Sequence, residues 1–263
     1  MLRDITIGQH YPADSIIHRL DPRTKLIGSL LMIVALFLIT PLFGYGVVLI
    51  VLSTVILLSK VPVKFILKGL KPILFFIVIA VSINMFLTPG RVVFSFWILE
   101  ITAEGIDRAL MTFFRFTFLI VTSSMVTLTT SPMALTDGIE RLLSPLKKVK
   151  FPAHELAMMM TIALRFIPTL IEEADKIMKA QMARGADFES GNIFKRAKNM
   201  IPLLVPLFIS AFRRADELAM AMEARCYRGG EGRTRLNVLK YNTSDYIALI
   251  LSFIYVVLVV IYL

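Results

Sequence analysis

Two arginine-centred triplets recur in the last hundred residues of this 263-residue chain: Ala183-Arg184-Gly185 and Ala224-Arg225-Cys226. Each ends a segment of charged and apolar residues. An offset of 41 aligns 172–187 (EEADKIMKAQMARGAD) with 213–228 (RRADELAMAMEARCYR) at five identical positions. A guanidinium binds a carboxylate through two parallel hydrogen bonds, and small flanking residues let a partner approach closely. The repeat therefore predicts two matching contacts with a dimeric partner.

The composition is that of an integral membrane protein. Hydrophobic residues make up 57% of the chain, and the mean hydropathy is +0.75, far above that of a soluble domain. About 20 helical residues span a hydrocarbon core of roughly 30 Å. Four uncharged runs stand out at this scale: Leu26–Ser59, Pro72–Gly90, Phe116–Thr136 and Tyr246–Leu263. We therefore expect an all-α membrane fold.

The first of these runs is too long for one helix. Pro41, Gly44 and Gly46 near its middle predict two short helices joined by a tight turn. Lysines and arginines gather on the side that holds the N-terminus and the loop after this hairpin, and this bias assigns that side to the cytoplasm. The loop Arg91–Arg108 is acidic on balance and is expected outside. The prediction is a multi-pass cell-membrane protein of about five spans, with a cytoplasmic N-terminus and an extracellular C-terminus.

Residues 131–240 hold 18 of the 29 basic and 12 of the 19 acidic residues, with no uncharged run of spanning length. Prolines in this region predict helix starts. We expect a short helix at Met133–Leu143, a long helix at Ala153–Ala183 kinked at Pro168, and a second long helix from about Pro202 to Glu223. The resulting plan is a four-span membrane domain at 1–130, a cytoplasmic helical domain at 131–240 and a C-terminal transmembrane helix at 241–263.

Enzymatic chemistry is not expected. The sequence has no phosphate-binding G-x-x-x-x-G-K-[ST] loop and no serine nucleophile elbow, and its three histidines lack metal-ligand spacing. The net charge of +10 reflects basic residues at span ends and among acidic residues, so no nucleic-acid partner is expected. Arg115 is the one charge expected to enter the bilayer, and we expect it to extend to the outer interface rather than line a transport path.

The arginine triplets and the apolar parts of the two long helices also have interpretations that involve no partner protein. A helix that ends in an arginine and a glycine is common. The apolar parts of the two long helices are consistent with burial against each other, with a position at the membrane interface, or with a docking surface. Nine of the fourteen methionines fall within 131–240, and flexible thioethers suit a surface that fits several partners.

The chain resembles the transmembrane T components of energy-coupling factor transporters, the EcfT/CbiQ family, over nearly its whole length. The resemblance rests on the first triplet and on four further segments: 18–25 (HRLDPRTK), 163–168 (ALRFIP), 212–217 (FRRADE) and 223–230 (EARCYRGG). It implies a scaffold without enzymatic activity or cofactor of its own. Such a scaffold joins two cytoplasmic ABC ATPases of the EcfA type, a homo- or heterodimer that binds the ATP, to a membrane S component that captures a vitamin or metal ion.

The resemblance also implies that the two motifs insert into grooves on the ATPases. Arg184 and Arg225 would be the coupling residues, and Ala183, Gly185, Ala224 and Cys226 would shape the fit. The substrate, and the number of S components that share the module, are properties of other subunits. The alternative from a different class is a stand-alone carrier or channel whose basic cytoplasmic helices bind anionic lipid. A membrane-embedded enzyme ranks third.

Overall fold

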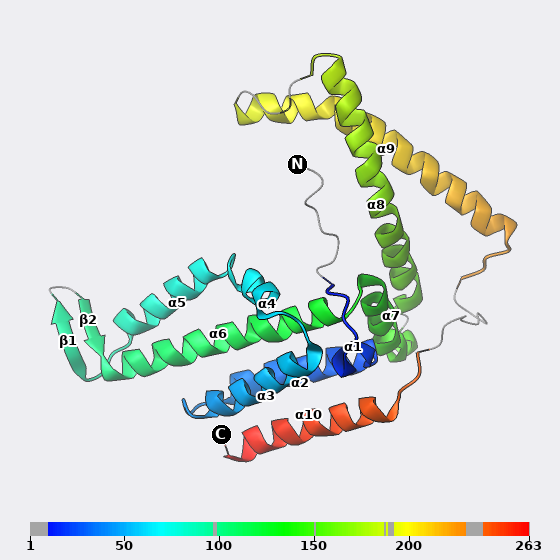
Figure 1. The fold of residues 1–263 in the computed structure, drawn as a ribbon. Coiled ribbons are helices and arrows are strands. Elements are labelled where there is room, and N and C mark those ends of the chain that lie inside the picture. Colours follow the sequence, from blue (N-terminus) through cyan, green and yellow to red (C-terminus); the bar gives the residue numbers. More distant parts are fainter. Residues whose placement is uncertain are drawn as a thin grey trace. The chain divides into compact units, whose positions relative to one another are not determined.

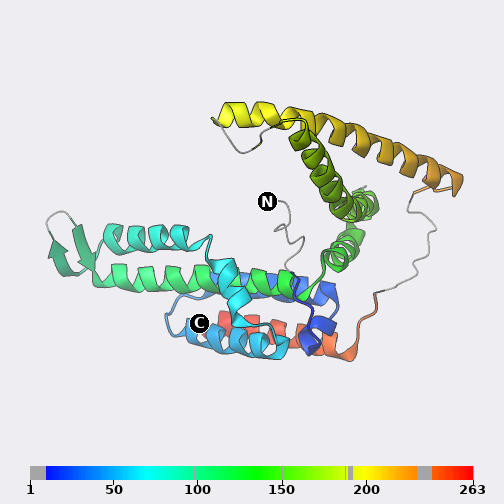
Figure 2. The same cartoon turned by 45° about the horizontal axis from the view of Figure 1, so that its top comes forward.

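A computed structural model describes residues 10–96, 99–149, 151–186, 188, 192–229 and 239–262. These residues divide into two compact units. We call 10–142 with 239–262 the bundle unit and 143–229 the inserted unit, because the second interrupts the first in sequence. Figures 1 and 2 show that both units consist almost entirely of helices. The predicted all-α membrane fold is confirmed, with one small β-hairpin as an addition.

The first long uncharged run folds as a helical hairpin, as predicted. Helices α2 (Pro22–Leu38) and α3 (Gly44–Ser59) are separated by a short turn that contains Pro41. A short helix, α1 (Ile16–Arg19), precedes them. Asp21 caps the start of α2, because its carboxylate accepts a hydrogen bond from the N–H of Arg23 (2.9 Å).

Two features between α3 and α6 (Ala103–Thr129) differ from the sequence-based expectation. Helix α4 (Val63–Leu70) precedes α5 (Leu74–Leu87), and the two are bent by 62° relative to each other. Strands β1 (Val92–Phe96) and β2 (Leu99–Thr102) then form an antiparallel hairpin where a loop was expected. Their β-branched and aromatic residues are the local signal for strands.

Helix α6 is longer than the span predicted at Phe116–Thr136. Thr102 fixes its start, because the threonine hydroxyl accepts a hydrogen bond from the N–H of Gly105 (2.9 Å). The charged residues after this cap, including Arg115, therefore lie inside the helix. The uncharged run Phe116–Thr136 therefore covers only the apolar part of α6 and continues past its end. Helix α7 (Pro132–Leu143) begins as a separate element after Thr129.

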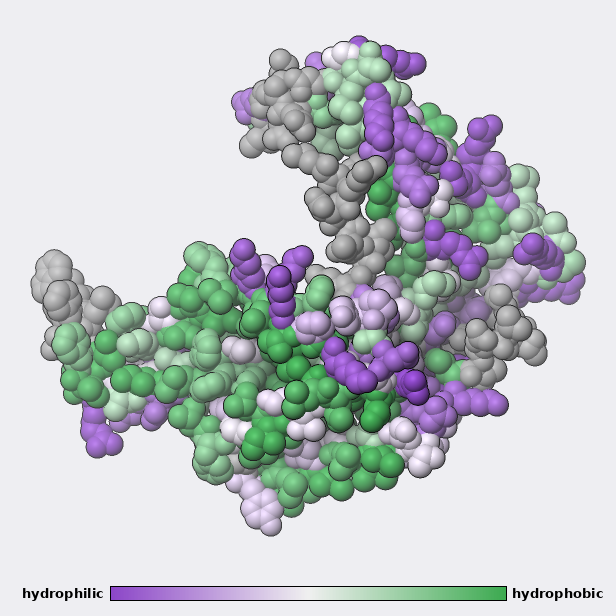
Figure 3. Space-filling view, viewed as in Figure 1, coloured by the Kyte–Doolittle hydropathy of each residue, from purple (hydrophilic) through white to green (hydrophobic). Residues whose placement is uncertain are grey.

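The core of the bundle unit lies where α2, α3, α6 and α10 (Thr243–Tyr262) pack together. Its most buried side chains include Leu36, Val48, Leu128 and Val259. The outward faces of these helices are also apolar: Phe253, for example, is 62% exposed. Figure 3 shows this hydrophobic surface along the bundle helices. Helices that are apolar on their outer faces as well as in the core are typical of a protein surrounded by lipid.

Three of the described helices are long and apolar enough to cross a membrane: α6, α8 (Ala153–Ala183) and α10. The bent pair α4–α5 would be a fourth span, and α3 is a shorter apolar helix. Helix α8 lies in the region where no uncharged spanning run was found. It is nevertheless apolar enough to cross a membrane, because Glu155 and Arg165 are the only formal charges in its first 19 residues. The five-span plan and the orientation of the termini stay predictions.

The described part of the inserted unit contains the 3₁₀ helix η2 (Ser144–Val149), α8 and α9 (Ile193–Ala224). Helix α8 has the predicted bounds. The predicted start of the second long helix near Pro202 is wrong, because α9 already begins at Ile193 and contains Pro202 and Pro206. Each internal proline removes one backbone donor. The residues before Pro202 (IFKRAKNM) include several good helix formers, so the helix extends through both prolines.

Arg115 of α6 holds the α2–α3 turn. Its Nε donates a hydrogen bond to the hydroxyl of Tyr45 (3.0 Å), and its Nη2 donates to the carbonyl of Ile39 (3.2 Å), the C-cap residue of α2. A cation beside a helix C-terminus is also favoured by the helix dipole. The sequence-based expectation was that this side chain extends to the outer interface. The structure shows its guanidinium bound to residues of the hairpin turn, and its position relative to the membrane stays a prediction.

Removing one of these acceptors should destabilise the bundle unit. Tyr45 is only 2% exposed, and a hydrogen bond to a charged group contributes about 1.5–3 kcal/mol. We expect Tyr45→Phe to lower the thermal midpoint of the detergent-purified protein by roughly 3–9 °C. Tyr262→Phe is the matched control, because Tyr262 is 74% exposed. Equal midpoints for both variants would show that the contact does not stabilise the hairpin.

Candidate functional site

Helix α8 ends at the first arginine triplet. Arg184 is its C-cap, and Gly185 adopts a left-handed conformation with φ +86°. The N–H of Gly185 donates to the carbonyl of Met182 (3.0 Å), and the N–H of Ala186 donates to the carbonyl of Gln181 (2.9 Å). These two bonds form a Schellman motif, which satisfies carbonyls that a helix C-terminus would otherwise leave unpaired.

Helix α9 ends in the same way at the second triplet. Arg225 follows its last residue, and Cys226 is left-handed with φ +54°. The N–H of Cys226 donates to the carbonyl of Glu223 (2.8 Å), and the N–H of Tyr227 donates to the carbonyl of Met222 (3.0 Å). Every donor and acceptor lies 41 residues beyond its counterpart in α8. The repeat in sequence is therefore also a repeat in backbone structure.

The triplets present their arginines to solvent. All six residues are exposed, and no described carboxylate forms an ion pair with Arg184 or Arg225. The left-handed residue after each arginine turns the chain away, so that each arginine lies at the tip of its helix. The flanking residues Ala183, Gly185, Ala224 and Cys226 are small. Each tip is suited to two-point binding of a carboxylate in a narrow groove.

The two helices contact each other through equivalent positions of the repeat. Arg214 of α9 donates from Nη2 to Oε2 of Glu173 in α8 (3.2 Å), and the hydroxyl of Ser210 donates to Oε1 of Glu173. Glu173 and Arg214 are separated by the 41-residue offset. When two equivalent elements are related by a two-fold axis, a residue that lies on the axis contacts the equivalent residue of the other element. The contact therefore indicates that α8 and α9 form a pseudo-symmetric pair, and they cross in Figures 1 and 2.

The charges of the repeat fit this symmetry. Glu172 and Glu173 in α8 correspond to Arg213 and Arg214 in α9. A repeat of identical charge would place two like charges together on the axis, whereas the reversal places opposite charges there. Eleven residues separate this ion pair from the triplet arginine of each helix, which is about 16 Å at 1.5 Å per residue. The two arginines therefore lie equally far along their helices from the crossing.

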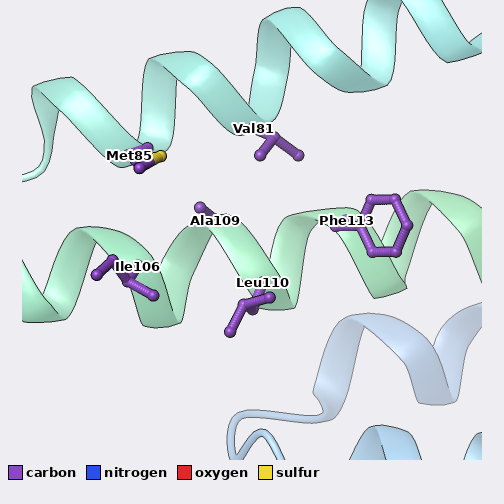
Figure 4. A pocket seen from close by; sticks show the side chains of 6 residues that line it. All are labelled: Val81, Met85, Ile106, Ala109, Leu110 and Phe113. Carbon is purple, nitrogen blue, oxygen red and sulfur yellow. The ribbon is translucent and has the colours of Figure 1, made fainter. Parts of the chain in front are cut away.

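The bundle unit contains an apolar hollow between α5 and α6. Its volume is about 280 Å³, and Figure 4 shows the six side chains that line it: Val81, Met85, Ile106, Ala109, Leu110 and Phe113. None of them carries a group that could bind a polar substrate or transfer a proton. Among the described residues, no group of three or more His, Cys, Asp or Glu side chains could hold a metal ion. The arginine tips are thus the strongest candidate for a functional site.

Comparison with known proteins identifies the family. A family model described as cobalt transport protein, CbiQ, matches residues 13–236. This chain belongs to the EcfT/CbiQ family. It is 58% identical over 245 residues to the energy-coupling factor transporter transmembrane protein EcfT of Ruminiclostridium cellulolyticum, covering 93% of this chain and 92% of that protein. The proteins of the same name from Clostridium kluyveri and Lactococcus lactis are 57% and 44% identical, over 94% and 99% of this chain and 93% and 98% of theirs.

Membership of the EcfT/CbiQ family makes the chain a transmembrane component of an energy-coupling factor transporter. Its role is therefore membrane transport. The comparisons do not test individual residues, so the binding role of the six triplet residues stays a prediction. Sequence reasoning did not single out Glu173 and Arg214, although both lie in the aligned segments. The signal that points to them is the reversal of charge at equivalent positions.

The left-handed caps give a matched pair of substitutions. A residue with a Cβ atom costs about 1 kcal/mol more than glycine in this conformation. Cys226→Gly should therefore slow hydrogen exchange at the Tyr227 amide about fivefold. Gly185→Ala should accelerate exchange at Ala186 by a similar factor, because no atom lies near enough to clash and only the φ angle is strained. Unchanged exchange in both variants would contradict the assigned caps.

The crossing ion pair should show measurable coupling. Its side chains are only 36% (Arg214) and 26% (Glu173) exposed. We expect a double-mutant cycle of Glu173→Gln and Arg214→Gln to give a coupling energy of about 1 kcal/mol in thermal unfolding. The control is the Arg213–Glu217 pair, which is 82% and 65% exposed at 4.0 Å and should couple by less than about 0.5 kcal/mol. Equal coupling in the two cycles would argue against a stabilising crossing.

Proposed function

We propose that this chain is the coupling component that transmits ATP-driven movements of two cytoplasmic ABC ATPases to a membrane-embedded S component, for uptake of a vitamin or a metal ion. The observation that carries the proposal is the pseudo-symmetric helix pair. Arg184 and Arg225 lie on equivalent caps, equally far from the Glu173–Arg214 crossing. Two ATPases of the same kind offer two similar grooves, and two equivalent arginine tips match them.

The chemistry of each contact follows from the tip. The planar guanidinium of Arg184 or Arg225 would pair with a carboxylate in a groove of one ATPase. Ala183, Gly185, Ala224 and Cys226 would let the walls of the groove approach closely. The ATPases, a homo- or heterodimer, would bind and hydrolyse the ATP. The chain would contribute neither catalytic residues nor a cofactor, and its work would be mechanical.

Both helix tips are suited to transmitting a force from the ATPases to the helices. The Schellman motif fixes the last turn of each helix, so that a force on the arginine reaches the helix without loss through fraying. Glu173 and Arg214 tie α8 to α9, with Ser210 as a second contact to Glu173. A movement of either ATPase would therefore displace both helices together.

The region 131–240 would be the cytoplasmic coupling domain between the membrane domain at 1–130 and the last helix at 241–263. Its long helices expose apolar side chains beyond what a solvated helix needs: Met159, Met160, Phe208 and Phe212 are 55%, 42%, 62% and 67% exposed. Such a surface suits an apolar membrane partner, the S component. With this domain in the cytoplasm, the N-terminus would be cytoplasmic and the C-terminus extracellular.

Charge reversal at both tips tests the proposal. We expect Arg184→Glu with Arg225→Glu to abolish co-purification of the two ATPases and to reduce cellular uptake more than tenfold, since breaking a buried charge pair costs about 2–5 kcal/mol. Lys176→Glu with Lys198→Glu is the matched control. It makes the same change of charge at exposed positions of the same two helices, and it should leave both measurements near wild type.

Wild-type uptake in the Arg184→Glu, Arg225→Glu variant would refute the proposal. The purified chain should also fail to transport substrate when reconstituted alone in liposomes. Transport without ATPases would instead indicate a stand-alone carrier.

A further inference from the structure

The turn Asp21-Pro22-Arg23, at the start of α2, contacts the helix that leads into the inserted unit. Helix α7 is the last element of the bundle unit before residue 143. Its Gly138 is buried against the turn so closely that an added Cβ atom would lie 2.9 Å from Cβ of Pro22 and 3.5 Å from the backbone nitrogen of Arg23. The position leaves no space for any larger residue.

The same turn contacts the segment that returns from the inserted unit. Nη2 of Arg23 donates to the carbonyl of Leu239 (3.4 Å), and its guanidinium carbon lies 3.9 Å from the centre of the Tyr241 ring. The N–H of Asp21 donates to Oδ1 of Asp245 (2.8 Å). The other oxygen of Asp245 accepts from the backbone of residue 242 (2.8 Å).

The turn is itself rigid. Arg23 donates from Nε and Nη2 to the two carboxylate oxygens of Asp21 (3.0 and 2.8 Å), and the side chains are 13% and 3% exposed. Burial opposes ionisation of Asp21, but the hydrogen bonds from Arg23 outweigh it and lower the Asp21 pKa below its ordinary value. Lys25, the fourth residue of α2, donates to the carbonyl of Thr129 at the end of α6 (2.8 Å). The turn is thus fixed to the core helices.

We propose that the Asp21-Pro22-Arg23 turn is the junction that passes movement of the inserted unit to the bundle helices, with Arg23 and Asp245 as its positioning residues. The segment 143–237 has two covalent connections to the bundle unit, and both are attached to this turn. A displacement that arrives along either connection reaches the start of α2, and through α2 it reaches α6 and α10. This inference rests on the proposed coupling function.

The experiment uses the chain in complex with its two ATPases and follows hydrogen exchange with and without a non-hydrolysable ATP analogue. In the wild type, the analogue should change exchange at the α8 and α9 tips and at the first turns of α2 and α10. We expect Arg23→Lys, which keeps the charge but loses the two-point contact, to reduce the change in α2 and α10 about threefold or more. The change at the tips should stay at the wild-type level.

Two further variants sharpen the test. Asp245→Asn keeps an oxygen for the N–H of Asp21 but turns its other acceptor into a donor, so it should give the same pattern as Arg23→Lys. Arg19→Lys is the matched control, because Arg19 is 77% exposed and its ion pair with Asp14 is long, at 3.7 Å. Its exchange pattern should equal that of the wild type.

A wild-type response of α2 and α10 in both Arg23→Lys and Asp245→Asn would overturn the proposal. So would an equal loss of response at the tips and in the bundle, because it would show that the turn only maintains the fold. A wild-type complex in which the analogue changes nothing at the tips would instead refute the coupling function itself.

Discussion

One buried carboxylate, that of Asp245, joins the first and last long helices of the bundle unit. Asp245 is only 1% exposed, and its two oxygens accept the N–H groups of Asp21 and Asn242. It therefore joins the start of α10 to the start of α2 across 224 positions of sequence. Backbone donors at helix starts have no partner within their own helix, and near a bilayer an unpaired one costs several kcal/mol. The pairing of the first and last long helices of the bundle depends on this acceptor.

Because lipid surrounds the bundle unit, a few polar contacts between helices determine how the helices are arranged. The outer faces of the bundle helices are apolar, and lipid provides little hydrophobic force to select one helix arrangement over another. The polar contacts lie instead at helix ends. Lys25 binds the end of α6 through the carbonyl of Thr129, and Arg115 binds the end of α2 through the carbonyl of Ile39. Both contacts join α6 to the α2–α3 hairpin, which makes α6 the central helix.

The sequence predicts well what is encoded locally. Pro41 between apolar runs predicts the hairpin, and the bounds of α8 follow from a proline at its start and a glycine after its end. The start of α9 is not predicted, because Pro202 removes one hydrogen bond without ending the helix. Contacts between distant residues also lie beyond local rules. The aligned repeat contains Glu173 and Arg214, but their opposite charges at equivalent positions indicate a contact only once the two helices are known to cross there.

The two halves of the helix pair are equivalent but not identical. Gly185 adopts its left-handed conformation without cost, whereas Cys226 carries a strain of about 1 kcal/mol in the same role. The residues after the caps also differ, with Ala186-Asp187 in one half and Tyr227-Arg228 in the other. The equivalence of the two halves therefore lies in their backbone hydrogen bonds and in the Glu173–Arg214 crossing, and it does not extend to the sequence after the caps.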